Sequence, residues 1–188
     1  IEASVCFDEN RQAKGSKALV GITYAAGQEM IVNREGHEYG NRWRNARPDV
    51  SRVPPGDITP WLDHCRLLVP DERELNHIWD VMAFKLQHPE IKVNHAILHG
   101  GDQGSGKDTM WAPFIWSVCG AHLKNRGLLD NDTMSSQFGY ALESEILILN
   151  ELKEPDAKER RALANRLKPI IAAPPEMLTI NRKGLHPY

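Results

Sequence analysis

Ten residues rich in glycine have the types and spacing of a phosphate-binding loop. Residues 100–109 read GGDQGSGKDT and fit the pattern G-x-x-x-x-G-K-[ST] at Gly101, Gly106 and Lys107. Asp108 occupies the position where Ser or Thr normally binds Mg²⁺. Glycines let successive backbone N–H groups turn toward an anion, and a following helix adds the positive end of its dipole. The predicted nucleotide-binding residues are Gly101, Asp102, Gln103, Gly104, Ser105, Gly106, Lys107, Asp108 and Thr109.

A second motif is a pair of polar residues, Asn150 and Glu151, that follows a run of aliphatic residues. Residues 145–151 read EILILNE, which predicts a buried strand that ends at Asn150 and Glu151, as in the second nucleotide motif (Walker B). As catalytic residues we expect Lys107, which would reach the terminal phosphates of ATP, and Glu151, which would act as general base or orient the attacking water. The alternatives are a glycine-rich surface turn with a stray lysine, and a core strand that ends at the surface.

Mg²⁺ would be held by residues from both motifs. Hard oxygen ligands suit this ion, and the predicted ligands are Asp108, Thr109 and Asn150. A carboxylate replaces Ser or Thr at position 108, and Asn replaces the usual Asp at position 150, so the number of acidic groups is kept. We hypothesise that Asp108 acts on Mg²⁺ directly or through water. The alternative is that Asp108 only caps the helix and Thr109 binds the ion.

These residues need elements to position them. Residues 94–99 are short and apolar and predict a buried strand before the loop, and residues 110–119 predict a helix that ends at Gly120. Pro113 inside that helix removes a backbone donor and predicts a kink. A charged helix is expected over residues 154–171.

The first half of the chain predicts short strands, a linker and two helices. Short strands are expected at 18–24 and 29–33, with 37–39 pairing back, and residues 53–56 (VPPG) predict a linker. A helix capped by Thr59 would follow, and residues 71–74 form a capping box for the next helix. The apolar stripe of that helix, more typical of a core than of a ligand site, is Leu75, Ile78, Trp79, Met82 and Leu86.

Three arginines surround Trp43 within residues 41–47. Such a cluster can hold phosphates and a stacked base. A solvated edge with one tryptophan anchored in the core is the commoner arrangement, and we favour it.

Composition suits one α/β domain with a modest extension. The chain has 188 residues, and its 41% apolar residues can supply a core. Its net charge of -2 argues against wholesale coating of nucleic acid. Its 3 cysteines (Cys6, Cys65 and Cys119) are far apart, and its 8 histidines have no metal spacing, so neither disulfides nor a zinc site are expected. No apolar run could span a membrane, so we expect no membrane partner and a reducing cytoplasm.

With these motifs in place, the sequence resembles the superfamily-three helicase domains of phage and plasmid primase-helicases, including the poxvirus-type group. The resemblance extends from about residue 41 onward. Besides the two motifs, it rests on residues 41–43, 56–68, 79–92, 167–169 and 181–184. The phosphate loop alone is widely shared. The short distance from the loop to the acidic residue and the lysine-bearing segment 181–184 make the resemblance more specific.

The resemblance implies a P-loop NTPase (AAA+-like) α/β core with a parallel sheet, preceded by a small mixed lead-in. We place the lead-in at residues 1–55 and the core at residues 56–188. ATP and Mg²⁺ would be the cofactors, and single-stranded DNA the partner, bound by Lys168, Arg182 and Lys183. The whole protein would be a homo-oligomer, a hexameric ring linked to a primase or polymerase domain, encoded by a phage or prophage in a bacterial cell.

Two further expectations follow from the resemblance. The third motif of the family would come after Tyr188, as would the arginine that a neighbouring subunit supplies. The chain is therefore expected to be a piece of a longer protein, and alone to bind nucleotide poorly or hydrolyse it slowly. Two other functions stay open: a replication scaffold that binds nucleotide without turnover, and a small P-loop phosphotransferase.

Overall fold

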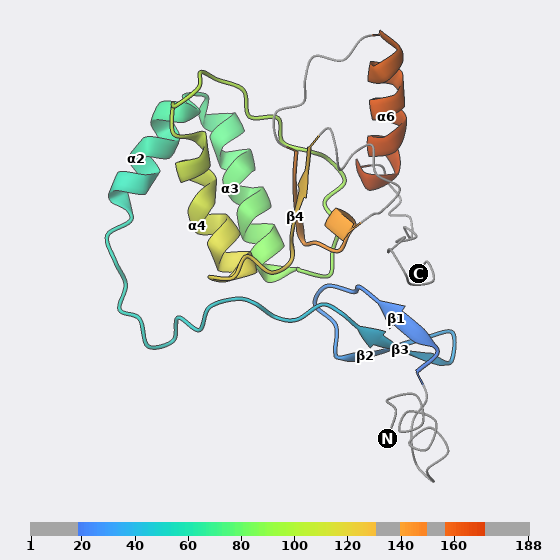
Figure 1. Cartoon of the computed structure of the whole chain (residues 1–188). Helices are drawn as coiled ribbons and strands as arrows, with labels where there is room; N and C mark the ends of the chain where they lie inside the picture. Colours follow the sequence, from blue (N-terminus) through green and yellow to red (C-terminus); the bar gives the residue numbers. More distant parts are fainter. Residues whose placement is uncertain (1–18, 131–139, 150–156, 172–188) are drawn as a thin grey trace.

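The computed structural model describes residues 19–130, 140–149 and 157–171. These residues form a small α/β protein with one mixed sheet, one parallel sheet and four helices. Figure 1 shows three parts: a three-stranded sheet near the N-terminus, a group of three helices, and a second sheet beside them with one further helix. The α/β class and the parallel sheet pairing agree with the prediction.

The first sheet contains β1 (Gly21–Thr23), β2 (Ile31–Arg34) and β3 (His37–Asn41) in the order β1-β3-β2. Strands β2 and β3 form an antiparallel hairpin, whereas β1 pairs in parallel with β3. The hairpin turn is Glu35-Gly36, and both residues have positive φ (52° and 83°), as a tight two-residue turn requires. The three predicted strands are confirmed.

Asn41 holds this sheet to the loop that precedes β2. Its side chain is buried and accepts hydrogen bonds from the backbone N–H groups of Ala25 and Trp43. It also donates to the carbonyl oxygens of Ala25, Gln28 and Glu29. A buried amide with every bonding capacity used fixes one geometry for the loop.

Three helices build the core. They are α2 (Thr59–Leu68), α3 (Glu72–Gln87) and α4 (Lys107–Cys119). The predicted cap of α3 is confirmed, since Asp71 accepts from the backbone N–H groups of Arg73 and Glu74. Helix α2 begins one residue from the prediction: Ile58 is its N-cap, and Thr59 is already helical. The apolar core between the helices is Cys65, Val69, Leu75, Ile78, Met82, Met110, Phe114, Val118 and Cys119.

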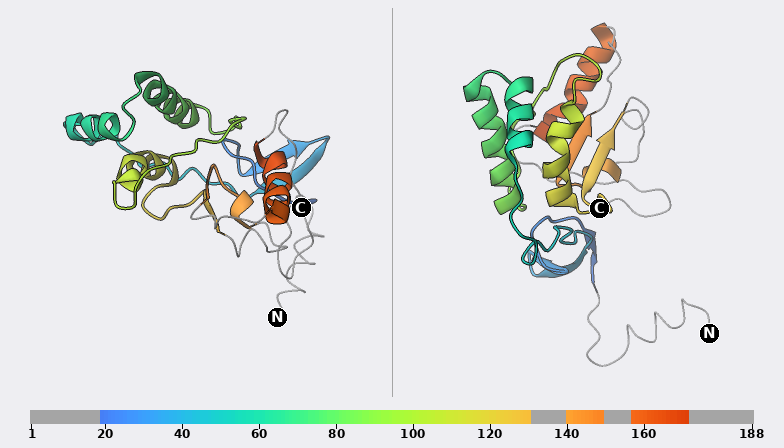
Figure 2. Two further views of the ribbon diagram at one scale, coloured as in Figure 1. Left: turned by 90° about the horizontal axis from the view of Figure 1, so that it is seen from above. Right: turned by 90° about the vertical axis from the view of Figure 1, so that its left-hand side faces the viewer.

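The second sheet pairs β4 (Arg126–Leu129) with β5 (Ile146–Leu149) in parallel. The short 3-10 helix η1 (Tyr140–Leu142) precedes β5, and α6 (Ala157–Ile171) follows it in the chain. Figure 2 shows this sheet next to α4 in both views, and its right-hand view shows the three-stranded sheet below both. Ile146 packs against the helical core, so the two layers share one apolar interior.

The strand expected at residues 94–99 is not formed, and that prediction is wrong. The segment has no regular secondary structure, and Leu98 is 97% exposed, although Ile97 packs against the core. In the described part of the chain, β4 and β5 pair only with each other, so residues 94–99 have no neighbouring strand to pair with. An extended segment without a ladder partner leaves its backbone groups to water.

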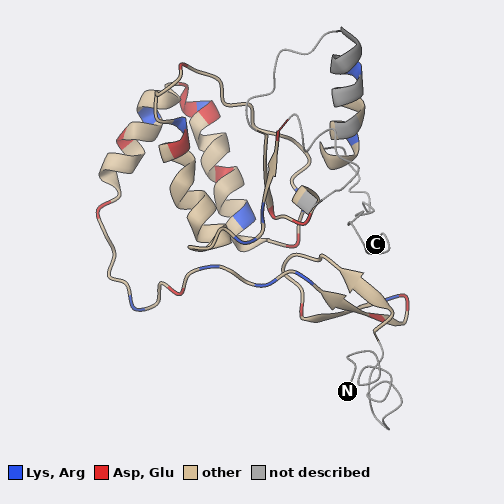
Figure 3. Ribbon diagram, viewed as in Figure 1, with Lys and Arg blue, Asp and Glu red and all other residues tan. Residues whose placement is uncertain are grey.

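Charge and sulfur chemistry add little that could constrain function. Figure 3 shows basic residues at the start of the segment between β3 and α2, and acidic and basic residues alternating after them. Cys65 and Cys119 are buried and free. Within the described ranges, no helix is long and apolar enough to cross a membrane, and no group of three His, Cys, Asp or Glu side chains could hold a metal ion.

Candidate functional site

The glycine loop leads directly into α4. Gly101, Gly104 and Gly106 have φ values of 139°, 78° and 89°, which side chains with a Cβ rarely adopt. Gly106 is the N-cap of α4, and no side chain caps this end of the helix. The first backbone N–H groups of a 13-residue helix therefore open toward the loop. This is the arrangement in which a helix terminus can bind an anion.

Lys107 turns back into the loop. Its Nζ atom donates to the carbonyl oxygens of Gly101 at 2.8 Å and Asp102 at 2.6 Å, and lies 3.2 Å from Ser105 Oγ. The structure thus brings together four of the residues predicted to bind nucleotide. Asp108 and Thr109 are exposed in the first turn of α4, where a carboxylate is favourable for the helix dipole.

Helix α2 supports this end of the loop. The Nε2 atom of His64 lies 3.0 Å from the carbonyl oxygen of Gly106. One turn earlier, Trp61 donates from Nε1 to the carbonyl oxygen of Met110 at 3.1 Å. Two side chains of α2 therefore fix the start of α4. No local sequence pattern indicates these contacts, because the paired residues are more than 40 positions apart.

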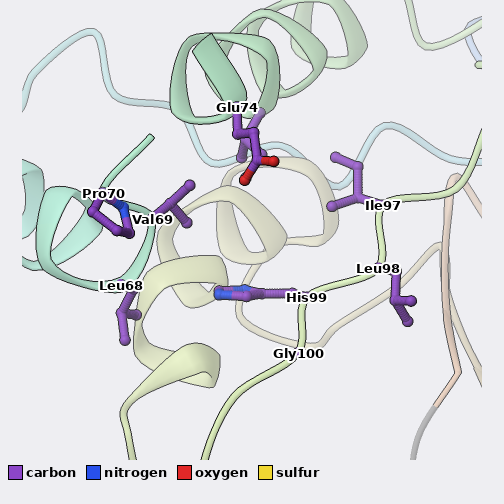
Figure 4. Close-up of a pocket in the computed structure, with 9 residues that line it drawn as sticks. Leu68, Val69, Pro70, Glu74, Ile97, Leu98, His99 and Gly100 are labelled. Carbon is purple, nitrogen blue, oxygen red and sulfur yellow. The ribbon is translucent and has the colours of Figure 1, made fainter. Parts of the chain in front are cut away.

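A pocket of about 180 Å³ lies just before the loop, between the end of α2, the first turns of α3 and residues 97–100. Figure 4 shows the carboxylate of Glu74 pointing toward the space above the ring of His99, with Val69 and Ile97 on opposite sides. Trp111 donates from Nε1 to Nδ1 of His99 at 3.0 Å. Burial, and secondly the nearby ammonium of Lys107, lower the pKa of His99. These two polar residues were not predicted from the sequence.

Strand β5 begins at a buried ion pair. The side chain of Glu145 is fully buried, and Arg47 contacts it with Nη2 2.9 Å from Oε2 and Nη1 3.3 Å from Oε1. Trp43 donates to Oε1 from its indole nitrogen at 2.6 Å. Arg42 pairs with Glu143 at 3.4 Å. The tryptophan is anchored as expected, but Arg42 and Arg47 turn toward these carboxylates, so the 41–47 segment is a contact between the two sheets.

The remaining predicted site residues lie apart from the loop or outside the described residues. Lys168 is exposed on α6. The predicted catalytic Glu151 and the predicted metal ligand Asn150 lie outside the described ranges, and so do Arg182 and Lys183. Strand β5 is described to Leu149, the residue before Asn150, so the end that the motif predicts at Asn150 and Glu151 lies outside the described residues.

Comparison with known proteins places the fold. The model of DUF5906, a family of unknown function, matches residues 98–188. An apo structure of the NrS-1 C-terminal region (305–718) has a TM-score of 0.69 at 22% identity, over 98% of this chain and 44% of that one. The A-form apo structure of the same region has a TM-score of 0.68 at 21% identity, over 98% and 43%. The chain thus spans less than half of these structures, and it matches no curated protein.

Proposed function

We propose that this chain is the nucleotide-binding part of an ATP-driven motor that moves on single-stranded DNA in a phage-type replication protein. The observation that carries the proposal is the loop of three positive-φ glycines that opens onto the N-terminus of α4, with Lys107 inside it. Such a loop offers backbone N–H groups, the helix dipole and one ammonium to a phosphate chain.

Two other observations support it. Strand β5 is partly buried, runs parallel to β4 and leads to Asn150 and Glu151, the order in which the second nucleotide motif follows the first. The fold is that of the NrS-1 C-terminal region, and the sequence resembles superfamily-three helicases of phage replication proteins. Neither observation alone specifies the reaction, because a fold hosts many activities.

In the proposed reaction, the γ-phosphate lies in the loop and Lys107 moves from the loop carbonyls to the phosphate oxygens. Mg²⁺ would be bound by Asp108, Thr109 and Asn150, and it would neutralise charge on the β- and γ-phosphates. Glu151 would orient the attacking water. Exposed Lys168, together with Arg182 and Lys183, would contact phosphates of the DNA strand. A hexameric ring and a linked primase or polymerase domain belong to the same proposal.

A nucleotide-binding scaffold without turnover is the second candidate. The exposed Asp108 at the first turn of α4 favours it, because this position normally supplies a hydroxyl to Mg²⁺. The two candidates differ in turnover, which can be measured.

The deciding experiment is ATP hydrolysis by the complete protein, with and without single-stranded DNA. The motor predicts hydrolysis that increases with DNA and is lost in Lys107→Ala. Lys124→Ala is the matched control, since Lys124 is exposed in the turn after α4, away from the loop. Tight ATP binding without turnover in either condition would favour the scaffold. DNA-stimulated hydrolysis that persists in Lys107→Ala would contradict the assignment of the glycine loop as the phosphate-binding site.

A further inference from the structure

The pocket beside the glycine loop ends where the loop begins. His99 and Gly100 line it, and the loop continues from Gly101. The ammonium of Lys107 is close enough to His99 to contribute to its lowered pKa. A ligand with its phosphates in the loop would therefore have its other end near this pocket.

Shape and lining suit one flat ring. The volume of about 180 Å³ is below the roughly 300–1,000 Å³ of sites that hold whole drug-sized ligands, so only part of a ligand would enter. The side chains of Leu68, Val69, Ile78 and Ile97 provide apolar contacts, and polar groups make up the rest of the wall, which is more than half of its surface. Sites that bury a ring combine apolar contacts with a few polar groups that orient it.

The polar groups of this wall have defined bonding roles. An indole nitrogen can only donate, so Nδ1 of His99, which meets Nε1 of Trp111, must accept. The neutral ring therefore carries its proton on Nε2, and the lowered pKa keeps it neutral. The carboxylate of Glu74 can only accept. The pocket thus has a fixed acceptor in Glu74, and the ring of His99, which lines it, keeps one N–H group free of the contact with Trp111.

We propose that this pocket holds the adenine ring of the nucleotide whose phosphates bind the glycine loop, with Glu74 accepting from the 6-amino group and His99 Nε2–H donating to a ring nitrogen. This proposal rests on the proposed function. Adenine matches because it presents an amino donor next to an acceptor nitrogen on one edge. In hypoxanthine and guanine, an oxygen replaces the 6-amino group, and it would face the carboxylate of Glu74. Leaving two acceptors opposed in a partly dry site is costly.

The experiment is equilibrium binding of ATP, ITP, GTP and inorganic tripolyphosphate to the complete protein. The variant Glu74→Met keeps the length of the side chain and removes its oxygens. Glu72→Met, on the same helix but outside the pocket lining, is the control. We expect wild type to prefer ATP over ITP and GTP, and Glu74→Met to weaken ATP roughly tenfold while tripolyphosphate binding stays unchanged.

A second variant, His99→Phe, keeps a flat ring and removes the donor, and it should also weaken ATP but not tripolyphosphate. Lys107→Ala should weaken all four ligands together. One contrary result is that wild type binds tripolyphosphate without distinguishing ATP from ITP and GTP, and another is that it binds GTP more tightly than ATP. Either result would contradict the adenine site and remain consistent with phosphate binding by the loop. If wild type binds none of the four, the proposed function fails, and the adenine pocket fails with it.

Discussion

The imidazole of His64 lies directly against Gly106, with Nε2 3.0 Å from the carbonyl oxygen of that glycine. A Cβ atom at position 106 would lie 2.7 Å from Cε1 of His64, closer than side-chain contacts allow. Gly106 also has a φ of 89°. The loop thus needs a glycine here for two independent reasons, one from its own backbone and one from helix α2.

Replacing Gly106 with alanine should therefore destabilise the protein by roughly 1–3 kcal/mol from backbone strain alone, and by more from the contact with His64. Gly104→Ala is the control, because Gly104 has a similar φ of 78° but no atom within 4 Å of the added methyl group. Urea unfolding of both variants measures the difference. Equal losses would show that the His64 contact does not constrain the loop.

Arg47 is expected to be a major stabilising residue because its partner, Glu145, is fully buried. Arg47→Ala removes the guanidinium from that carboxylate and leaves the indole of Trp43 as its side-chain hydrogen-bond partner within the described residues, so it should cost about 3–5 kcal/mol in the free energy of unfolding. The exposed pair Arg66–Asp63 provides the comparison, and Arg66→Ala should cost less than about 1 kcal/mol. Denaturant unfolding tests both, and similar costs would contradict the burial argument.

His99 should make stability depend on pH in the mildly acidic range. Protonation would place a hydrogen on Nδ1, facing the indole N–H of Trp111, and burial and Lys107 lower the pKa further. The unfolded chain then takes up the proton at higher pH than the folded one. This contribution to stability is full above the unfolded pKa of 6.5 and is lost as pH falls through the lower folded pKa.

The measurement is the urea midpoint of wild type and His99→Phe from about pH 8 down to about pH 5. Wild type should lose stability on acidification faster than the variant, since phenylalanine does not titrate. Parallel curves would show that the other histidines account for the whole dependence. NMR titration of the His99 ring would check the direction of the pKa shift independently.

Asp108→Ala should raise the Mg²⁺ concentration needed for ATP hydrolysis in the complete protein, roughly tenfold, if the carboxylate binds Mg²⁺ directly or through water. Asp108→Ser restores the usual residue and should recover much of the affinity. Asp63→Ala, on the exposed side of α2, is the control. An unchanged Mg²⁺ dependence in Asp108→Ala would leave Asp108 as a favourable charge at the N-terminus of α4 and assign the ion to Thr109.

Lys168→Ala should weaken single-stranded DNA binding by the complete protein without changing sequence preference. One lost phosphate contact lowers the slope of log K against log salt concentration by about 0.7 for single strands. Lys124→Ala should leave both affinity and slope unchanged. If Lys168→Ala behaves as Lys124→Ala does, the exposed end of α6 is not a DNA contact.

Sequence patterns located the elements whose causes are local. Asp71 is followed closely by an amphipathic stripe, and Gly120 follows an apolar run, so α3 and the end of α4 were predictable. Glycine spacing likewise predicted the loop from residue 101 to Lys107. Each of these features depends on backbone conformations that a few adjacent residues determine.

The features that local patterns did not predict correctly depend on residues far away in the sequence. Residues 94–99 are as apolar as a buried strand, but a strand needs a neighbour to pair with, and apolarity does not reveal whether one exists. The buried role of Glu145 depends on Arg47, 98 positions away. The roles of His64, Glu74 and His99 depend on how the three helices pack. No local pattern marks such residues, because scattered histidines and acids on helices are common.

The inward turn of Lys107 also bears on how strongly its ammonium could hold a phosphate. The ammonium already has two carbonyl oxygens and a hydroxyl oxygen as partners. For an incoming phosphate, binding is thus an exchange of partners, in which old hydrogen bonds break as new ones form. The hydrogen bonds that the ammonium already makes offset part of what a phosphate would gain from it, so Lys107 would contribute less to affinity than a lysine without such partners.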